Sequence, residues 1–346
     1  MISPGDLAFC RRLLAGGSRS FAAAARFLPA RYRNPAIALY GFCRLADDEI
    51  DEGLDPNLAL AGLLARLDAI YAGAPADTPV DRAFAAVVAA HGIPREVPAA
   101  LIEGFAWDAL LRRYETLDDL LAYATRVAGT VGVMMALVMG ETRSAQIARA
   151  SDLGIAMQLT NIARDVGADA ALGRVYLPLS WLRDAGIDAD AWLAAPSATP
   201  ALAQVVARLL EAADGFYLRA EGGLNQLPAA CRPSMMAARY LYAEIGNEVA
   251  RRGFDSVSQR AVVSGGRKLL LLGRALWSSL PAALGEQAAP DPAAEFLVRA
   301  VSVRTSEARA GDAASERSTP WWNVPARIER ALELFERLER IQRGLT

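Results

Sequence analysis

The sequence predicts an all-α protein. Apolar residues recur three and four positions apart along most of the 346 residues, and this spacing places them on one face of an α-helix. Alternating runs of β-branched residues, which are typical of strands, are scarce. Glycine and proline clusters interrupt the apolar pattern, and each one predicts a turn between helices. These clusters fall at 53–57, 73–79, 92–94, 195–200 and 227–228.

We expect one large helical domain over residues 1–283, followed by a tail over 284–346. Apolar residues make up 53% of the chain, which is enough to bury a sizeable core, and no break in composition divides the first part. The clearest linker is 285–292. The tail is expected to end in an amphipathic helix over 325–343, whose apolar side carries Ile328, Leu332, Phe335, Leu338 and Ile341. We expect it to pack on the domain; docking to a membrane or partner is the alternative.

The segment from Val127 to Gly140 is the most continuous apolar stretch and predicts a buried core helix, since it is too short to span a bilayer. The N-terminal residues show no basic segment followed by an apolar one, so no secretory signal is expected. The cysteines are widely separated and form no metal-type pair, which favours a reduced cytoplasmic setting. They are Cys10, Cys43 and Cys231.

Charge and residue usage exclude several functions. The net charge is −2 and both signs are interspersed, which argues against nucleic-acid binding. His91 is the only histidine and stands before a helix-ending Gly92-Ile93-Pro94 turn, while Lys268 is the only lysine. Histidine-dependent triads, histidine-rich zinc sites and most lysine covalent chemistry therefore lose their main residues. Carboxylate and metal chemistry remains.

Two acidic stripes are the candidate site. The first carries Asp47 and Asp51 on one helix face with Asp48 beside them, and the second carries Asn161, Asp165 and Asp169. Clustered carboxylates repel, and Asp and Asn are poor mid-helix residues. A hard divalent cation such as Mg²⁺ would offset both costs, because it binds carboxylates together with substrate phosphates. The alternative for either stripe is a solvated helix end.

Basic and hydroxyl residues accompany both stripes. Arg44 precedes Asp47 by three positions, where it would reach a phosphate oxygen or pair with Asp47 or Asp48. Arg174 follows the second stripe closely enough to contact the same anion. The segment 16–21 offers backbone amides, hydroxyls and a guanidinium at an expected helix start, which suits an anion, although serine there is also a common helix cap.

The chain resembles the squalene and phytoene synthase family, its bacterial phytoene-forming members in particular. The resemblance covers about residues 10 to 280 and rests first on the runs around the two stripes, 40–51 and 158–169, and on Arg174-Val175-Tyr176-Leu177-Pro178. It extends to further segments at 18–21, 123–132, 238–242 and 260–264. Another stretch resembling the family carries Asp108. The second stripe reads Gly-Ala-Asp where Gly-Glu-Asp is common, so one flanking carboxylate is missing.

The resemblance implies roles for residues at matching positions. The metal positions are Asp47, Asp48, Asp51, Asn161, Asp165 and Asp169. The substrate-binding positions are Ser18, Arg19, Ser20, Arg44, Tyr123, Arg164, Arg174 and Tyr176. Tyr40, Tyr123 and Tyr242 would line the reaction chamber, and Tyr40 and Tyr242 join Asp47, Asp51, Asp165 and Asp169 as expected catalytic residues.

The resemblance also implies a fold and a reaction. The fold would be an isoprenoid synthase helical bundle around a central cavity. The reaction would be prenyl transfer in carotenoid biosynthesis: two geranylgeranyl diphosphates condense head to head through prephytoene diphosphate to phytoene, with release of both diphosphates. Several Mg²⁺ or Mn²⁺ ions would bind with the substrate. The final proton acceptor is left open between released diphosphate and a tyrosine hydroxyl, since no histidine lies in the matching segments.

Alternatives remain at this point. NADPH is not expected, because no glycine-rich dinucleotide fingerprint follows a strand. Squalene or dehydrosqualene synthesis from farnesyl diphosphate is the second reading, and a non-catalytic assembly factor is the third. A hydrocarbon product suggests peripheral contact with the inner face of the membrane and with other enzymes of carotenoid synthesis. The sequence leaves the oligomeric state undetermined.

Overall fold

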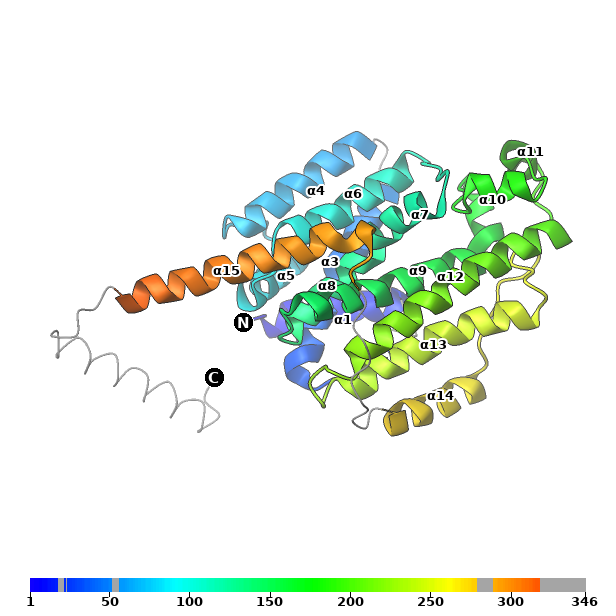
Figure 1. Ribbon diagram of the computed structural model, residues 1–346. Coiled ribbons are helices and arrows are strands. Elements are labelled where there is room, and N and C mark those ends of the chain that lie inside the picture. Colours follow the sequence, from blue (N-terminus) through cyan, green and yellow to red (C-terminus); the bar gives the residue numbers. More distant parts are fainter. Residues whose placement is uncertain (18–21, 23, 52–55, 279–288, 318–346) are drawn as a thin grey trace, which may run out of the picture. The chain divides into compact units, whose positions relative to one another are not determined.

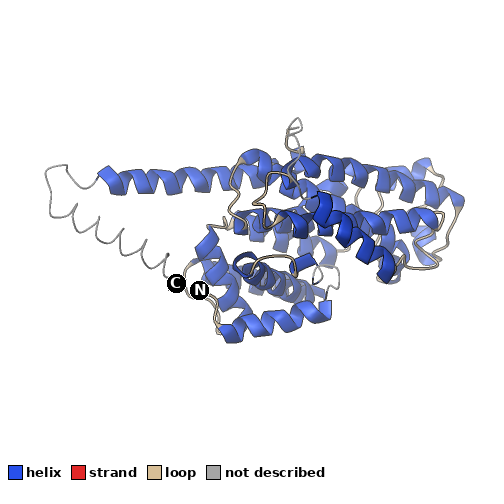
Figure 2. Ribbon diagram, turned by 90° about the horizontal axis from the view of Figure 1, so that it is seen from below, coloured by secondary structure: helices blue, strands red, loops and turns tan. Residues whose placement is uncertain are grey.

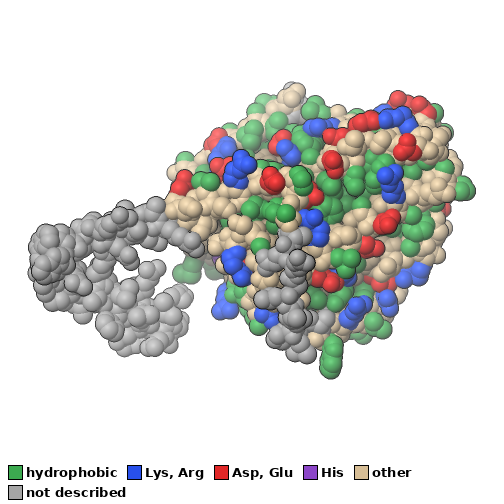
Figure 3. Space-filling model, viewed as in Figure 1, with side chains coloured by type: hydrophobic (Ala, Val, Ile, Leu, Met, Phe, Trp, Pro, Cys, Tyr) green, Lys and Arg blue, Asp and Glu red, His purple; other side chains and the backbone are tan. Residues whose placement is uncertain are grey.

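A computed structural model describes residues 1–17, 22, 24–51, 56–278 and 289–317 of the chain. Within these residues all regular structure is helical and no strand occurs, which confirms the predicted all-α class (Figures 1 and 2). The bundle surface mixes hydrophobic, acidic and basic side chains on the face seen in Figure 3, and no single charge dominates that face.

In the first part of the bundle, helices end where glycine and proline residues predicted turns. A threonine cap begins the helix at Pro79, where the Asp81 amide donates to the Thr78 side chain, and Gly92 ends it in a left-handed conformation with φ 60°. His91 is therefore the last helical residue before a turn, as expected. The helices in this part are α1 (Pro4–Gly17), α3 (Ala30–Asp51), α4 (Pro56–Tyr71), α5 (Pro79–His91) and α6 (Glu96–Ala109).

The expected core helix over 127–140 exists and continues from earlier residues. It comprises α7 (Leu117–Ala124), the π-helical turn η1 (Thr125–Gly129) and α8 (Thr130–Val138). The stretch Leu117–Val138 is long and apolar enough to cross a membrane by length and composition, yet most of its residues are buried inside the bundle. Burial by neighbouring helices identifies it as a core element.

The central helix is α9 (Ser144–Ala171), which packs against α8, η1, α12 and α13. Its buried residues include Leu159, Ile162 and Ala163. Figure 1 shows α12 lying along α9. Two short helices and two long ones follow α9: α10 (Leu179–Asp184), α11 (Ala189–Ala194), α12 (Pro200–Leu224) and α13 (Arg232–Arg251). The residues of α9 next to Asn161, the first residue of the second acidic stripe, are therefore part of the core.

The C-terminal region contains α14 (Gly265–Ser278), the 3-10 turn η2 (Pro292–Ala294) and α15 (Glu295–Arg317). The chain forms two compact units, Met1–Val301 and Ser302–Thr346. The described part of the second unit is the C-terminal portion of α15. The domain division expected at 283/284 stays a prediction, and the amphipathic helix expected over 325–343 lies outside the described residues.

Candidate active site

An apolar chamber of about 290 Å³ lies inside the bundle, between α3, η1, α8, α9 and α13. Much of its wall is aliphatic or small, and the predicted core segment supplies part of it. Wall residues of this kind include Leu39, Val127, Ala128, Val131, Gly132, Met135, Leu153 and Met157. Such a wall excludes water and accommodates a hydrocarbon chain.

The two helices that carry the acidic stripes, α3 and α9, both line the chamber. Tyr40 on α3, Asn161 on α9 and Tyr242 on α13 all line the same cavity. Asp47 lies about two helical turns beyond Tyr40, and Asp165 lies about one turn beyond Asn161. The two stripes thus extend from two walls of one chamber.

Arg44 forms ion pairs with two carboxylates of the first stripe. The Arg44 guanidinium lies 2.6 Å from Asp48 Oδ1 and 3.4 Å from Asp47 Oδ2, and all three side chains are partly exposed. This is one of the two arrangements expected for Arg44. Asp51 is the last residue of α3, and its side chain lies outside the described part of the structure.

In the second stripe, Asp165 pairs with two arginines. Arg164 Nε donates to Asp165 Oδ1 over 2.8 Å, and Arg260 reaches both carboxylate oxygens of Asp165 at 2.7 and 3.0 Å. Burial and the neighbouring Asp165 raise the pKa of Asp169 to about 7, although Arg174 favours its charged form. The positive charge around Asp169 therefore does not offset its burial and the repulsion from Asp165.

Arg260 reaches this site because of Gly167. The Gly167 amide donates to the Ser256 carbonyl over 3.0 Å, and a Cβ at this glycine would lie only 2.5 Å from the Val257 carbonyl oxygen. The segment after α13 can therefore lie directly on α9, two residues from Asp165. Sequence reasoning did not single out Arg260, although its segment belongs to those that resemble the family.

Asp108 forms a second polar centre beside the stripe. The hydroxyls of Tyr123 and Tyr176 donate to its two oxygens over 2.8 and 2.7 Å, and the two rings stack with centroids 5.2 Å apart. Burial, together with the Asp108 charge, raises the pKa of both tyrosines. Asp108 also helps raise the pKa of Asp169. Tyr123 is thus oriented toward Asp108, and it is not among the described residues that line the chamber.

The chamber rim meets the end of α1. A Cβ at Gly17 would lie 1.8 Å from the Tyr40 hydroxyl oxygen, so only glycine fits there without a shift. Burial raises the pKa of Tyr40, which keeps its hydroxyl protonated. Ser18, Arg19 and Ser20 come directly after Gly17 and lie outside the described residues.

The donor set fits a hard divalent ion that is shared with a substrate. No three His, Cys, Asp or Glu side chains within the described ranges are grouped as a ready metal cluster. Instead, Arg44 neutralises the first stripe, and Arg164 and Arg260 neutralise Asp165. Carboxylate and amide oxygens of this kind suit Mg²⁺, which commonly takes its remaining ligands from phosphates and water.

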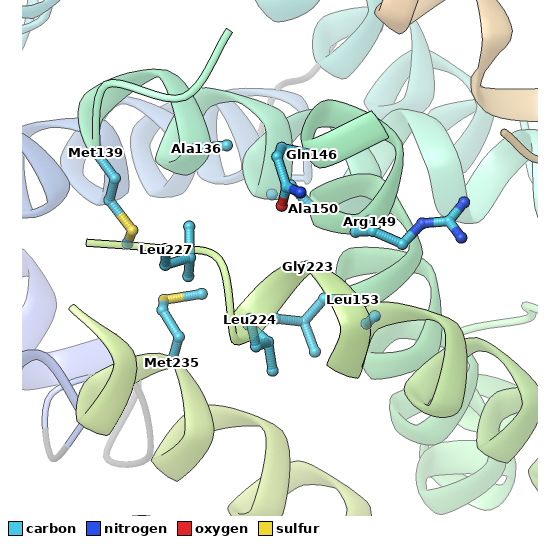
Figure 4. A pocket seen from close by; sticks show the side chains of 12 residues that line it. Ala136, Met139, Gln146, Arg149, Ala150, Leu153, Gly223, Leu224, Leu227 and Met235 are labelled. Carbon is cyan, nitrogen blue, oxygen red and sulfur yellow. The ribbon is translucent and has the colours of Figure 1, made fainter. Parts of the chain in front are cut away.

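A small inner cavity of about 30 Å³ lies beyond the chamber (Figure 4). It shares Gly132, Leu153 and Met235 with the chamber wall. Figure 4 shows the Met139, Leu227 and Met235 side chains around this space, while the Arg149 guanidinium points away. The two cavities are therefore neighbours, separated by side chains that belong to both.

Comparisons with known proteins agree with this geometry. The family model described as squalene/phytoene synthase matches residues 14–267. A phytoene synthase from Rhodobacter capsulatus is 49% identical over 312 residues, which cover 88% of this chain and 92% of that protein. A phytoene synthase from Cereibacter sphaeroides is 47% identical over 317 residues, which cover 87% of this chain and 89% of that protein.

Solved structures show the same architecture. A dehydrosqualene synthase crystallised with a ligand superposes with a TM-score of 0.74 at 30% identity, covering 79% of this chain and 96% of that one. A squalene synthase from Alicyclobacillus acidocaldarius gives a TM-score of 0.67 at 27% identity, covering 72% of this chain and 95% of that one. The bundle around a cavity is therefore an isoprenoid synthase helical fold.

Proposed function

The chain belongs to the squalene/phytoene synthase family, and we propose that its site joins two geranylgeranyl diphosphates head to head into phytoene. It is a prenyl transferase of carotenoid biosynthesis. The observation that carries this function is the chamber itself, an apolar space lined by the two helices that carry the arginine-paired acidic stripes. Prenyl diphosphates have a matching shape, with a hydrocarbon tail and an anionic head.

The first chemical step is ionisation. The carbon–oxygen bond of one substrate breaks with both electrons leaving on diphosphate, and an allylic cation remains. Arg44, Arg164 and Arg260 stand at the two stripes, where positive charge stabilises the departing anion. Preformed charges of this kind favour the transition state because they need little reorganisation.

The next steps take place in the apolar part of the chamber. The allylic cation alkylates the double bond of the second substrate, and loss of a proton gives the cyclopropylcarbinyl intermediate, prephytoene diphosphate. Its diphosphate then leaves, the carbon skeleton rearranges and a second proton is lost. The aliphatic wall around Leu39, Val131 and Met157 keeps water from these cations. Released diphosphate would accept the last proton, directly or through the hydroxyl of Tyr40 or Tyr242, which takes up this proton and gives its own to the diphosphate; both tyrosines line the chamber.

We further propose that several Mg²⁺ or Mn²⁺ ions bind with the diphosphates. Their ligands would come from Asp47, Asp48, Asp51, Asn161, Asp165 and Asp169. When bound, the ions supply Lewis-acid stabilisation of the leaving group. The observation that supports them is a set of oxygen donors on α3 and α9, two helices that form walls of one chamber.

Squalene or dehydrosqualene formation from farnesyl diphosphate is the second candidate. It is favoured by the likeness to a dehydrosqualene synthase structure, whereas the more identical relatives over most of the chain are named phytoene synthases. A scaffold without catalysis is disfavoured, because a scaffold gains nothing from neighbouring, partly buried carboxylates such as Asp165 and Asp169. We propose that no NADPH takes part.

We place the enzyme in the cytoplasm, in peripheral contact with the inner face of the membrane. The supporting argument is chemical: phytoene has no polar group and leaves water for an apolar phase. Contact with other carotenoid-forming enzymes would also let phytoene pass to the next enzyme without entering water.

The test is to identify the product. Purified protein is incubated with Mg²⁺ and either geranylgeranyl or farnesyl diphosphate, with and without NADPH, and the hydrocarbon is identified by mass spectrometry. Phytoene from the longer substrate without NADPH supports the proposal. Squalene or dehydrosqualene from the shorter one supports the second candidate, and absence of turnover with any combination supports a scaffold.

A further inference from the structure

The helix α14 is apolar on two opposite sides. Leu271 and Ala275 are almost fully buried, and α14 packs through this side on α13. Residues on the other side follow the same helical spacing, yet they are exposed, with Leu269 at 72% and Trp277 at 80%. Leu270 and Leu276 are exposed as well. We call Leu269, Leu270, Leu276 and Trp277 the outer face of α14.

Contacts with α13 fix the direction of this outer face. The Arg267 guanidinium donates to both carboxylate oxygens of Glu244 at 2.8 and 3.1 Å. Arg274 lies over the Tyr240 ring, 4.5 Å from its centroid. Both anchors join α14 to α13 and hold the buried side inward. Figure 1 shows α14 at the lower edge of the bundle, with α13 between it and the central helices.

The charges on α14 indicate which kind of surface its outer face contacts. The helix contains Arg267, Lys268 and Arg274 and no acidic residue, although the whole chain carries a net charge of −2. On the helical wheel these basic residues lie between the buried side and the outer face. Leucines and a tryptophan at the centre with basic residues at both borders are typical of helices that lie in a membrane interface, where the cations reach lipid phosphates.

We infer that the outer face of α14 docks the enzyme on an anionic lipid surface. This inference rests on the proposed function, because a water-insoluble hydrocarbon product gives the enzyme a reason to work at that surface. Leu269, Leu270, Leu276 and Trp277 enter the boundary between headgroups and acyl chains. Lys268 lies at the border of this face, at the level of the phosphates, while Arg267 and Arg274 keep their contacts with Glu244 and Tyr240 on α13.

The test compares the full-length wild type with a variant carrying Leu269→Ser, Leu270→Ser and Trp277→Ser. Each protein is sedimented with vesicles of phosphatidylcholine alone and with vesicles that also contain phosphatidylglycerol. A control variant carries Leu58→Ser and Leu218→Ser, which remove exposed leucines from α4 and α12. Product formation is measured separately with substrate dispersed in detergent.

The wild type is expected to sediment with the anionic vesicles, and the α14 variant is expected to bind about tenfold more weakly. The control is expected to bind as the wild type does, and all three proteins should keep their activity in detergent. Activity in detergent tests the proposed function independently of the vesicle result. A wild type that stays in the supernatant, or an α14 variant that binds as well as the wild type, would overturn the inference. The inference would also be overturned if the wild type formed a dimer in lipid-free solution and the α14 substitutions dissociated it. The outer face of α14 would then be the contact with a second copy of the chain.

Discussion

Asp165 and Arg260 form a two-point ion pair, with Nε to Oδ1 at 2.7 Å and Nη2 to Oδ2 at 3.0 Å, although 95 positions separate them in the chain. The pair ties the segment after α13 to the acidic stripe on α9. It also raises the pKa of Arg260 further, so the guanidinium stays charged. Arg260 thus occupies both oxygens of a carboxylate that we propose as a metal ligand.

Replacement of Arg260 by alanine is expected to have opposite effects on metal binding and on catalysis. The free protein should bind Mn²⁺ more tightly, because Asp165 loses a competing cation. Turnover should fall about tenfold or more, because a charge-assisted contact to diphosphate is lost. Isothermal titration with Mn²⁺ and steady-state kinetics would measure the two effects. Arg95→Ala, which removes an exposed partner of Asp68, serves as control; parallel losses of both properties would contradict this account.

Replacement of Asp108 by alanine is expected to destabilise the protein by about 3 kcal/mol, since two buried tyrosine hydroxyls lose their acceptor. Tyr123→Phe removes one donor and leaves the pair between Tyr176 and Asp108 intact, so it should cost about 1 kcal/mol. Urea unfolding measures both free energies. Equal losses for the two variants would show that the hydroxyls do not depend on Asp108.

Glu244 should make stability depend on pH. Burial would raise its pKa, but hydrogen bonds from Arg267, Arg251 and Asn247 outweigh burial and lower the pKa to about 2, against 4.5 for an unperturbed glutamate. Since the folded-state pKa is depressed, the stabilisation is full above pH 4.5 and is lost as the pH falls toward 2.

Glu244→Gln is therefore expected to lower the free energy of unfolding by about 2 kcal/mol at pH 7. The difference from the wild type should shrink as the pH falls below 4.5. Urea unfolding at several pH values measures it, with Glu96→Gln as an exposed control. A difference that stays constant down to pH 3 would mean that the ion pairs of Glu244 are not its source.

Met235 is expected to influence chain length, because it lines both the chamber and the inner cavity. Met235→Phe should reduce the space on this side of the chamber and shift the ratio of kcat/KM values from geranylgeranyl toward farnesyl diphosphate by about tenfold. Met235→Leu roughly conserves volume and should leave the ratio unchanged. Competition between the two substrates measures the ratio directly. An unchanged ratio in a folded Met235→Phe protein would exclude the inner cavity from chain-length selection.

Local signals in the sequence predicted much of the fold. The helices that end at His91 and Leu224 end close to the turns that glycine and proline predicted. These residues act within a few positions, because glycine adopts the left-handed cap conformation and proline has no amide to donate. The segment from Val127 was expected as a core helix, and it is buried. Its π-helical turn was not expected, since apolar periodicity does not distinguish a wider turn from a regular helix.

The site was only partly accessible from the sequence. Residues four apart on one helix predicted the two stripes, and Arg44 lies on its stripe as its spacing suggested. Arg260 and the pairing of Asp108 with two tyrosines depend on contacts between distant segments, which no local pattern encodes. The outer face of α14 was also not foreseen, because a run of leucines in a helix normally predicts burial.

The central claim is that the carboxylates of α3 and α9 act together to ionise a diphosphate in the chamber. Phytoene formation from geranylgeranyl diphosphate, titrated with Mg²⁺, tests it most directly when the wild type is compared with Asp47→Asn, Asp165→Asn and the exposed control Asp77→Asn. We predict that each of the first two lowers kcat by a factor of about 100 or more, while Asp77→Asn matches the wild type. Full activity in both Asp47→Asn and Asp165→Asn would contradict the account.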